Sequence, residues 1–329
     1  MSQKPSADSG RSVWRPETAG AVIRAGLLHT RLGEVRRRSG QSRPPAFYPR
    51  FLLLLCLLVL AGCSPVGAHL DASQAHIVHW QGRVDVTEDL IFDAGTTLVL
   101  APGTEVVFHP VLPENDRFSR HPNFPGAELI VRGRLLAHGT FEAPIVFRAA
   151  DPAAAAGSWG GINIERSPRA EFDYCVFQSA NSALHAREST VFVEHSLFRR
   201  NLVGVRFHSS DILIENNLFT ENGSAIRFHF GAPVICHNRF VANRRSIFIT
   251  AHPRDLRIEN NNFISAVDYH LVLGEEVPED VDATRNWWGG DTGEIAPLIY
   301  DRRREGHLGQ VLLAPLLKQP AQEDIPWNR

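Results

Sequence analysis

Apolar residues recur at a nearly fixed interval over the second half of the chain. Within each copy of the repeat, apolar and polar positions alternate, which is the period of a β-strand and not of a helix. Each copy therefore holds about three short strands, with Asn, Gly or Ser at the bends. The aromatic anchors of successive copies lie 21 residues apart and then 23 and 25 apart: Phe177, Phe198, Phe219, Phe240, Phe263 and Trp288. A fixed period of this length predicts a solenoid.

Other apolar positions keep the same register. Five residues before the anchor stand Phe172, Val193, Ile214, Ile235, Ile258 and Ala283; seven after it stand Leu184, Val205, Ile226 and Ile247; nine after it stand Ala186, Phe207, Phe228 and Ile249. Parallel strands that stack by coiling place each side chain about 4.8 Å above its equivalent in the previous coil. The pattern predicts an all-β, single-stranded right-handed parallel β-helix with about 21 residues per coil. A leucine-rich horseshoe has a similar period, but its leucine motif and helical return are missing from the sequence.

Asparagine occupies one further column, two residues before the anchor. After Cys175 and Ser196, this column continues as Asn217, Asn238, Asn261 and Asn286. Inward-facing asparagines at a repeated bend can form a ladder in which each amide bonds to the next. The alternative is that these four are ordinary turn residues. Four asparagines in one register favour the ladder.

Several segments outside the regular repeat have a recognisable pattern, namely "TTLVLAPGTEVVF" (96–108), the segment 128–149, "WGGINI" (159–164) and the segment 285–320. The first three look like the opening coils, and the last like the usual C-terminal end, of bacterial β-helix proteins of the pectin-lyase-like superfold. The resemblance covers roughly residues 80–320. It implies the fold but no single activity, because the superfold hosts lyases, hydrolases, adhesins and proteins without known activity.

A secretory signal precedes the predicted solenoid. Residues 51–62, "FLLLLCLLVLAG", form an apolar run that is too short to span a bilayer, and basic residues precede it. The sequence "LAGC" resembles the bacterial lipoprotein box, which implies diacylation of Cys63. Ser64 follows in place of an aspartate, which favours the outer membrane. The alternative is an ordinary signal peptide with a chance cysteine.

The domain boundaries follow from these features. Residues 1–50 carry ten basic and three acidic residues without sustained periodicity, so we expect a disordered leader, or a translation start nearer Val35. Residues 63–79 are a lipidated N-terminus and linker, 80–300 the β-helix, and 301–329 a capping segment and tail. Residues 63–329 contain 24 basic and 33 acidic residues, a net charge of about −9 that argues against nucleic-acid binding. Cys175 and Cys236, about 14 Å apart by strand spacing, are too distant for a disulfide.

Outward-facing columns carry the candidate functional residues. An acidic stripe lies four residues before the anchors and comprises Asp173, Glu194, Glu215 and Glu259, with Cys236 in the remaining coil. A basic stripe lies eight and ten residues after the anchors and comprises His185, Arg187, Arg206, His208, Arg227 and His229. Like charges at this spacing repel, so a counter-ion or ligand would relieve them. Alternatively, both stripes are solvated faces with partners elsewhere in the chain.

Three functions fit these stripes. A flat face of arginines could bind a polyanionic glycan, because guanidinium offers forked donors to carboxylate or sulfate. Paired carboxylates could instead hydrolyse a glycosidic bond, or acidic residues could hold Ca²⁺ for elimination of uronates. A third possibility is a lipid-anchored scaffold or adhesin. The sequence lacks a compact Asp-rich signature of pectate lyases or polygalacturonases, so catalytic residues stay unknown and binding is favoured.

Other candidates add little. The loop 110–127 interrupts the repeat, and its Asp116, Arg117, Arg120 and His121 could line a groove. No P-loop, G-x-S-x-G, H-E-x-x-H or C-x-x-C motif occurs. His195 and His237 share a column two coils apart, but we assign no metal ligand and no cofactor. We therefore expect a monomeric envelope lipoprotein that is anchored in a membrane and binds polysaccharide, not nucleic acid.

Overall fold

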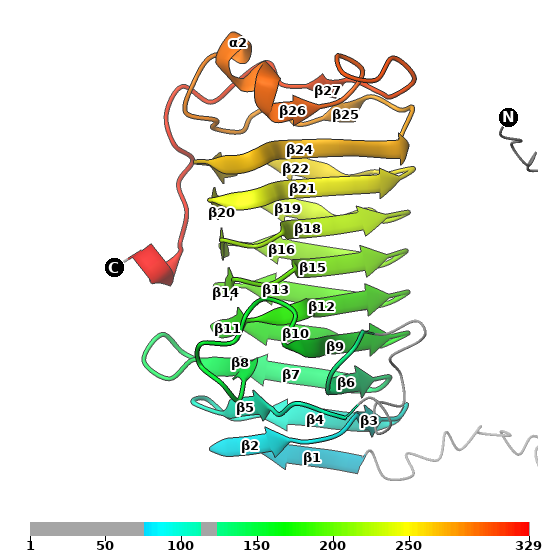
Figure 1. The fold of residues 1–329 in the computed structure, drawn as a ribbon, viewed down its shortest axis with the longest axis vertical. Helices are drawn as coiled ribbons and strands as arrows, with labels where there is room; N and C mark the ends of the chain where they lie inside the picture. Colours follow the sequence, from blue (N-terminus) through cyan, green and yellow to red (C-terminus); the bar gives the residue numbers. More distant parts are fainter. Residues whose placement is uncertain (1–75, 113–123, 329) are drawn as a thin grey trace, which may run out of the picture. The chain divides into compact units, whose positions relative to one another are not determined.

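The computed structural model describes residues 76–112 and 124–328. The predicted leader, signal segment and Cys63 lie outside these residues, as do the four named residues of the loop 110–127. In the described part, the chain coils so that strands of successive turns stack in parallel (Figure 1). They form three parallel sheets, and a typical coil contributes one strand to each sheet. The predicted right-handed parallel β-helix is confirmed.

The three sheets, here named A, B and C, contain most of the strands. Sheet A comprises β1 (His76–Trp80), β4 (Thr96–Leu100), β7 (Arg134–His138), β10 (Ala170–Asp173), β13 (Thr190–Glu194), β16 (Asp211–Glu215), β19 (Val234–Cys236) and β22 (Arg257–Glu259). Sheet B comprises β2 (Arg83–Val86), β5 (Glu105–Phe108), β8 (Ile145–Ala149), β11 (Cys175–Gln178), β14 (Leu197–Arg199), β17 (Leu218–Thr220), β20 (Arg239–Val241) and β23 (Asn262–Phe263). Sheet C comprises β3 (Leu90–Phe92), β6 (Glu128–Val131), β9 (Trp159–Glu165), β12 (Ala180–Arg187), β15 (Val203–His208), β18 (Ser224–His229), β21 (Asn243–Ala251), β24 (Ala266–Glu276) and β26 (Ile299–Tyr300).

The solenoid core consists of the predicted apolar columns. In sheet B, Phe198 pairs in register with Phe219, and Phe219 pairs with Phe240. Their rings stack at centroid distances of 4.8 and 5.3 Å, and all three side chains are fully buried. The columns five residues before and seven or nine residues after the anchor are also buried, on sheets A and C. The repeat length therefore sets the strand register of the core.

Two asparagine ladders satisfy the backbone at the corners between sheets. In the first, each of Asn217, Asn238 and Asn261 donates its backbone N–H and its side-chain amide to Oδ1 of the next asparagine, at 2.8–3.0 Å. The ladder ends at Asn286, and its four side chains have no solvent exposure. A second ladder joins Asn201, Asn222 and Asn243 in the same way, three residues after the anchors. Buried amides that bond to one another fix the bends without leaving unpaired polar groups.

The residue before the first ladder turns with a left-handed backbone. This corner position is occupied by His195 (φ 43°), Asn216 (φ 56°), His237 (φ 55°) and Asn260 (φ 56°). Asn and His tolerate this conformation better than β-branched residues do. The turn ends the sheet A strand and, at His195 and His237, places the corner side chain beside the outward carboxylate of the preceding coil.

The ends of the solenoid differ in part from the sequence-based expectation. The first strand begins at His76, before the expected boundary at residue 80. At the other end, Trp288 stacks on Phe263 at 4.0 Å and is 5% exposed, whereas Trp287 is only half-buried. Trp288 therefore covers the end of the aromatic column. Beyond it lie β25 (Val281–Asp282), α2 (Thr292–Ile295), η1 (Ala296–Leu298), β27 (Val311–Leu312) and η2 (Pro326–Asn328).

The C-terminal tail runs back along the stacked coils (Figure 1). The Leu317 backbone N–H donates to the Asn286 carbonyl, and Ala321 bonds to the Asn262 side chain. Further along, the Trp327 indole N–H donates to the His195 carbonyl at 2.9 Å. The tail therefore lies along the corner that bears the left-handed residues. Among the described residues, no helix has the length and apolar character needed to cross a membrane.

Candidate functional site

An outward column of sheet C brings arginines and aromatic rings together. In successive coils, His185 pairs with Arg206, Arg206 with Arg227, and Arg227 with Phe248. We define the basic–aromatic face as this column together with neighbouring side chains, namely Phe124, Arg206, His208, Arg227, His229, Arg245 and Phe248. Strand spacing places equivalent positions about 4.8 Å apart, so the face presents a regular series of cationic groups.

Each arginine of this face lies over a phenyl ring. The Arg206 guanidinium is 4.9 Å from the ring centroid of Phe124, and that of Arg227 is 5.0 Å from Phe248. Arg245, which lies three residues before Phe248 on the same strand, is 5.4 Å from that ring centroid. Cation–π contacts of this kind hold each guanidinium against a ring and shield one side of it from water. The rings therefore orient the arginines before any ligand arrives.

The arginines are partly buried without an anionic partner. No described carboxylate forms an ion pair with Arg206, Arg227 or Arg245, although Arg187, Arg148 and other arginines of the solenoid have one. Burial, followed by repulsion from Arg227, lowers the pKa of Arg206 to about 10, and its Nε has no hydrogen-bond partner. Burial and Arg245 also lower the pKa of Arg227. Both groups keep their charge at neutral pH, so the described part of the face leaves positive charge uncompensated.

Two residues of the predicted basic stripe do not add to this charge. His185 is 8% exposed, and its Nδ1 lies 2.9 Å from the Asn163 side-chain oxygen. Burial, with a contribution from neighbouring arginines, lowers the pKa of His185 to about 3, so the ring is neutral. Arg187 bonds to Glu165 at 2.7 Å, which neutralises it within the chain. The positive part of the stripe therefore begins at Arg206.

His208 and His229 form a pair at the edge of the face. Their ring centroids are 4.5 Å apart, and the exposed Phe230 lies against both rings. Burial first, then the neighbouring His208 and Arg227, lower the pKa of His229. A bound anion would favour protonation of His229, so this residue can respond to both ligand and pH.

The acidic stripe lies on sheet A, where its members pair in register from Asp173 through Glu259. Corner residues of the following coil form hydrogen bonds or ion pairs with three of its four carboxylates. His195 lies 2.8 Å from Asp173, His237 lies 3.0 Å from Glu215, and Arg285 lies 2.5 Å from Glu259. Burial, then repulsion from Asp173, raises the pKa of Glu194. Because the stripes lie on different sheets, they do not form a shared site.

Sequence reasoning missed the aromatic members of the face. Phe248 was recognisable, because it continues the column of Arg206 and Arg227 one coil further. The column then reaches Val272 and Tyr300, which line a surface hollow together with Phe248, Gly274 and His307. Phe124 lies before β6 and belongs to no repeat, so no periodic signal could identify it. The structure thus extends the site from isolated charges to a mixed surface of arginine and aromatic side chains.

Comparison with known proteins supports the fold and adds no activity. Residues 155–275 match the family described as "Right handed beta helix region". This segment contains the strands β12–β21, which carry most of the basic–aromatic face. No curated protein and no solved structure matches the chain.

Proposed function

We propose that this β-helix binds an extended anionic polysaccharide on its basic–aromatic face. The observation that carries the proposal is the pair Arg206 and Arg227, which are half-buried against phenyl rings without a described carboxylate partner. Charged groups are usually paired when they are removed from water, so this arrangement favours an external anion. The ligand would supply the missing partner.

The chemistry of the face suits a sugar chain that carries carboxylate or sulfate groups. A guanidinium offers parallel N–H donors to either anion, and its hydrogen bonds strengthen where water is partly excluded. The exposed ring of Phe230 offers an apolar surface of the kind that can cover the C–H face of a sugar. Since equivalent side chains repeat every coil, a polymer can make the same contact more than once.

The location is part of the proposal. The apolar segment 51–62 and the "LAGC" sequence support a lipoprotein that is acylated at Cys63 and held on the bacterial envelope. A single solenoid tethered there would present sheet C to envelope or extracellular glycans. We propose a monomer, with the membrane as its partner through the lipid.

Calorimetric titration of the purified full chain tests the binding proposal. The probes are oligogalacturonate, heparin-derived oligosaccharide and neutral malto-oligosaccharide, each assayed also for cleavage products. We expect the anionic probes to bind without product formation, and we expect affinity to fall as salt rises. The neutral probe should not bind.

Arginine variants locate the binding surface. Arg206→Gln combined with Arg227→Gln should reduce affinity at least about a hundredfold, because each of the two lost charge-assisted bonds contributes about 1.5–3 kcal/mol. Arg169→Gln is the matched control, since Arg169 also lies over a ring, Phe192 at 5.1 Å, but is paired with Glu171 on the sheet A side. If neither anionic probe binds, or if both variants bind like the unmodified chain, the scaffold interpretation replaces this proposal. Cleavage products would instead identify an enzyme.

A further inference from the structure

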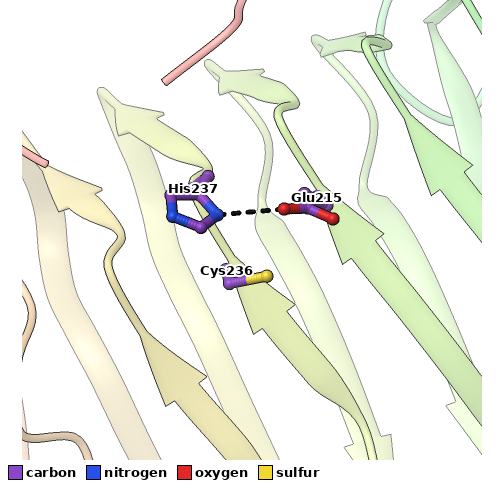
Figure 2. Close-up of side chains that lie close together, drawn as sticks. All are labelled: Glu215, Cys236 and His237. Atoms are coloured by element: carbon purple, nitrogen blue, oxygen red, sulfur yellow. Dashed lines mark hydrogen bonds and ion pairs between the residues drawn. The ribbon is translucent and has the colours of Figure 1, made fainter. Parts of the chain in front are cut away.

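A second cluster of chemically active side chains lies on sheet A, away from the basic–aromatic face. Glu215 ends β16 and Cys236 ends β19, and the two residues are register partners. His237 follows Cys236 at the left-handed corner, with a φ of 55°. This turn directs the imidazole toward Glu215, so that Nδ1 lies 3.0 Å from the carboxylate (Figure 2). One oxygen, one sulfur and one nitrogen atom thus lie within 4.8 Å of one another.

The thiol of Cys236 lies outside the apolar core. Cys236 replaces a carboxylate in the outward column that holds Asp173, Glu194 and Glu259. It is 5% exposed, but it does not belong to the cluster of apolar residues that fills the solenoid, whereas Cys175 does. The acidic column therefore has a thiol in place of a carboxylate in one coil, and the corner residue of this coil is a histidine.

From this geometry we infer that Glu215, Cys236 and His237 form a binding site for Zn²⁺ or a similar thiophilic divalent ion. Thiolate, imidazole and carboxylate are the three side-chain ligands that zinc uses in proteins. Tetrahedral ligands at about 2.0–2.3 Å from zinc lie about 3.4–3.7 Å from one another. The nitrogen and the oxygen are 3.0 Å apart and all three atoms lie within 4.8 Å of one another, so side-chain movements of about 1 Å would bring them to these separations.

The surroundings leave room for an ion to enter and for a fourth ligand. Glu215, Asn216 and His237 line a surface hollow together with the tail residues Gln322, Glu323 and Asp324. The Asn216 side chain accepts a hydrogen bond from the Asp324 backbone N–H at 3.0 Å, which fixes the tail at this rim. The Asp324 carboxylate is 89% exposed. Three protein ligands with an open position describe a site that binds a water molecule or a small ligand on the metal.

The neighbouring coils provide an internal comparison. Around Asp173, the register partner is Glu194 and the corner residue is His195, so this coil has the same geometry but a carboxylate in place of the thiol. Around Glu259, the corner residue is Arg285, whose guanidinium forms an ion pair with Glu259 and so takes the place that a metal ion would need. Of these three described arrangements, only the one at Cys236 combines a thiol with a histidine. The site does not depend on polysaccharide binding at sheet C.

Titration of the full chain with Co²⁺ tests the inference, because a thiolate bound to tetrahedral Co²⁺ gives a strong near-ultraviolet charge-transfer band. We expect one Co²⁺ per chain with this band, and we expect Zn²⁺ to displace it. Cys236→Ser should abolish the band, and Glu215→Gln or His237→Asn should weaken Co²⁺ binding at least about tenfold. Asparagine is chosen at residue 237 because it tolerates a left-handed backbone.

Matched variants distinguish Co²⁺ binding at this site from binding at the Cys175 thiol and from an effect of misfolding. His195→Asn changes the equivalent corner in the coil without a thiol, and Cys175→Ser removes a core thiol, so both should bind Co²⁺ like the unmodified chain. Glu194→Cys should create a second site beside Asp173 and His195 and raise the stoichiometry to two. The inference is overturned if the unmodified chain gives no thiolate band, or if the band persists in a folded Cys236→Ser chain.

Discussion

Replacing Asn238 with leucine tests how much the asparagine ladder contributes to the solenoid. The side chain has no solvent exposure, and its Oδ1 accepts hydrogen bonds from the backbone N–H and the side-chain amide of Asn217, both at 3.0 Å. Its Nδ2 donates to the carbonyls of Ile214 and Cys236 at 2.8 and 2.9 Å, and to Asn261 Oδ1 at 3.0 Å. Leucine has a similar size but can make none of these five bonds.

The size of the destabilisation depends on which polar groups lose their only hydrogen-bond partner. The Asn217 side-chain amide would still donate to the carbonyls of Val193 and Glu215, and Asn261 Oδ1 would still accept from the backbone of residue 238. The Asn217 backbone N–H, however, would be buried without an acceptor. An orphaned donor of this kind costs about 1–3 kcal/mol, and we expect Asn238→Leu to lower the free energy of unfolding by that amount.

Urea unfolding followed by circular dichroism measures the loss. Arg244→Leu serves as the control in the same coil, because the Arg244 side chain is 64% exposed and its ion pair with Asp268 is a surface pair. Surface pairs contribute little, so the control should change stability by less than about 0.5 kcal/mol. If Asn238→Leu is no more destabilising than Arg244→Leu, the ladder does not stabilise the solenoid and our reasoning about its corners is wrong.

Three further predictions concern the core, the pH dependence and the anchor. Phe219→Ala should cost about 3–5 kcal/mol, measured by the same unfolding assay, because it opens a cavity between Phe198 and Phe240; a loss below about 1 kcal/mol would contradict the stacked core. Burial lowers the pKa of His270 to about 4, so below pH 6.5 the unfolded chain gains a proton that the folded chain does not, and stability falls as pH falls. At pH 5 this amounts to about 2 kcal/mol, which His270→Gln should remove from the difference between pH 7 and pH 5; an unchanged difference would refute the assignment. Cys63→Ser should move the protein from the membrane to the soluble fraction and abolish palmitate labelling, whereas unchanged fractionation and labelling would exclude acylation at that cysteine.

The fold was predictable because stacking forces each position to repeat. The anchor phenylalanines and the asparagines of the first ladder share a register that only coiled parallel strands explain, and the core columns have the burial that this register requires. The second ladder was equally accessible, since Asn201, Asn222 and Asn243 each lie three residues after an anchor. The periodicity of the sequence is thus sufficient to predict the contacts of residues whose partners lie at the equivalent position of the next coil.

The candidate sites were predictable only in part, because their chemistry depends on residues outside the repeat. His185 belongs to the basic column, but Asn163 and Phe124 bury it and leave it neutral. The acidic column likewise gave no indication of its histidine partners. Left-handed corners place the side chains of His195 and His237 in contact with Asp173 and Glu215 of the preceding coils. A column pattern locates a side chain on a face, but its charge state depends on contacts from corners, loops and the tail.

The most direct test of polyanion binding is arginine footprinting of the full chain with phenylglyoxal, with and without heparin-derived oligosaccharide, read by mass spectrometry. We predict that the oligosaccharide slows modification of Arg206 and Arg227, whereas Arg169 and the exposed Arg254 react at unchanged rates. Equal protection of all four arginines, or protection of Arg169 and Arg254 alone, would contradict the assignment of the ligand to the basic–aromatic face.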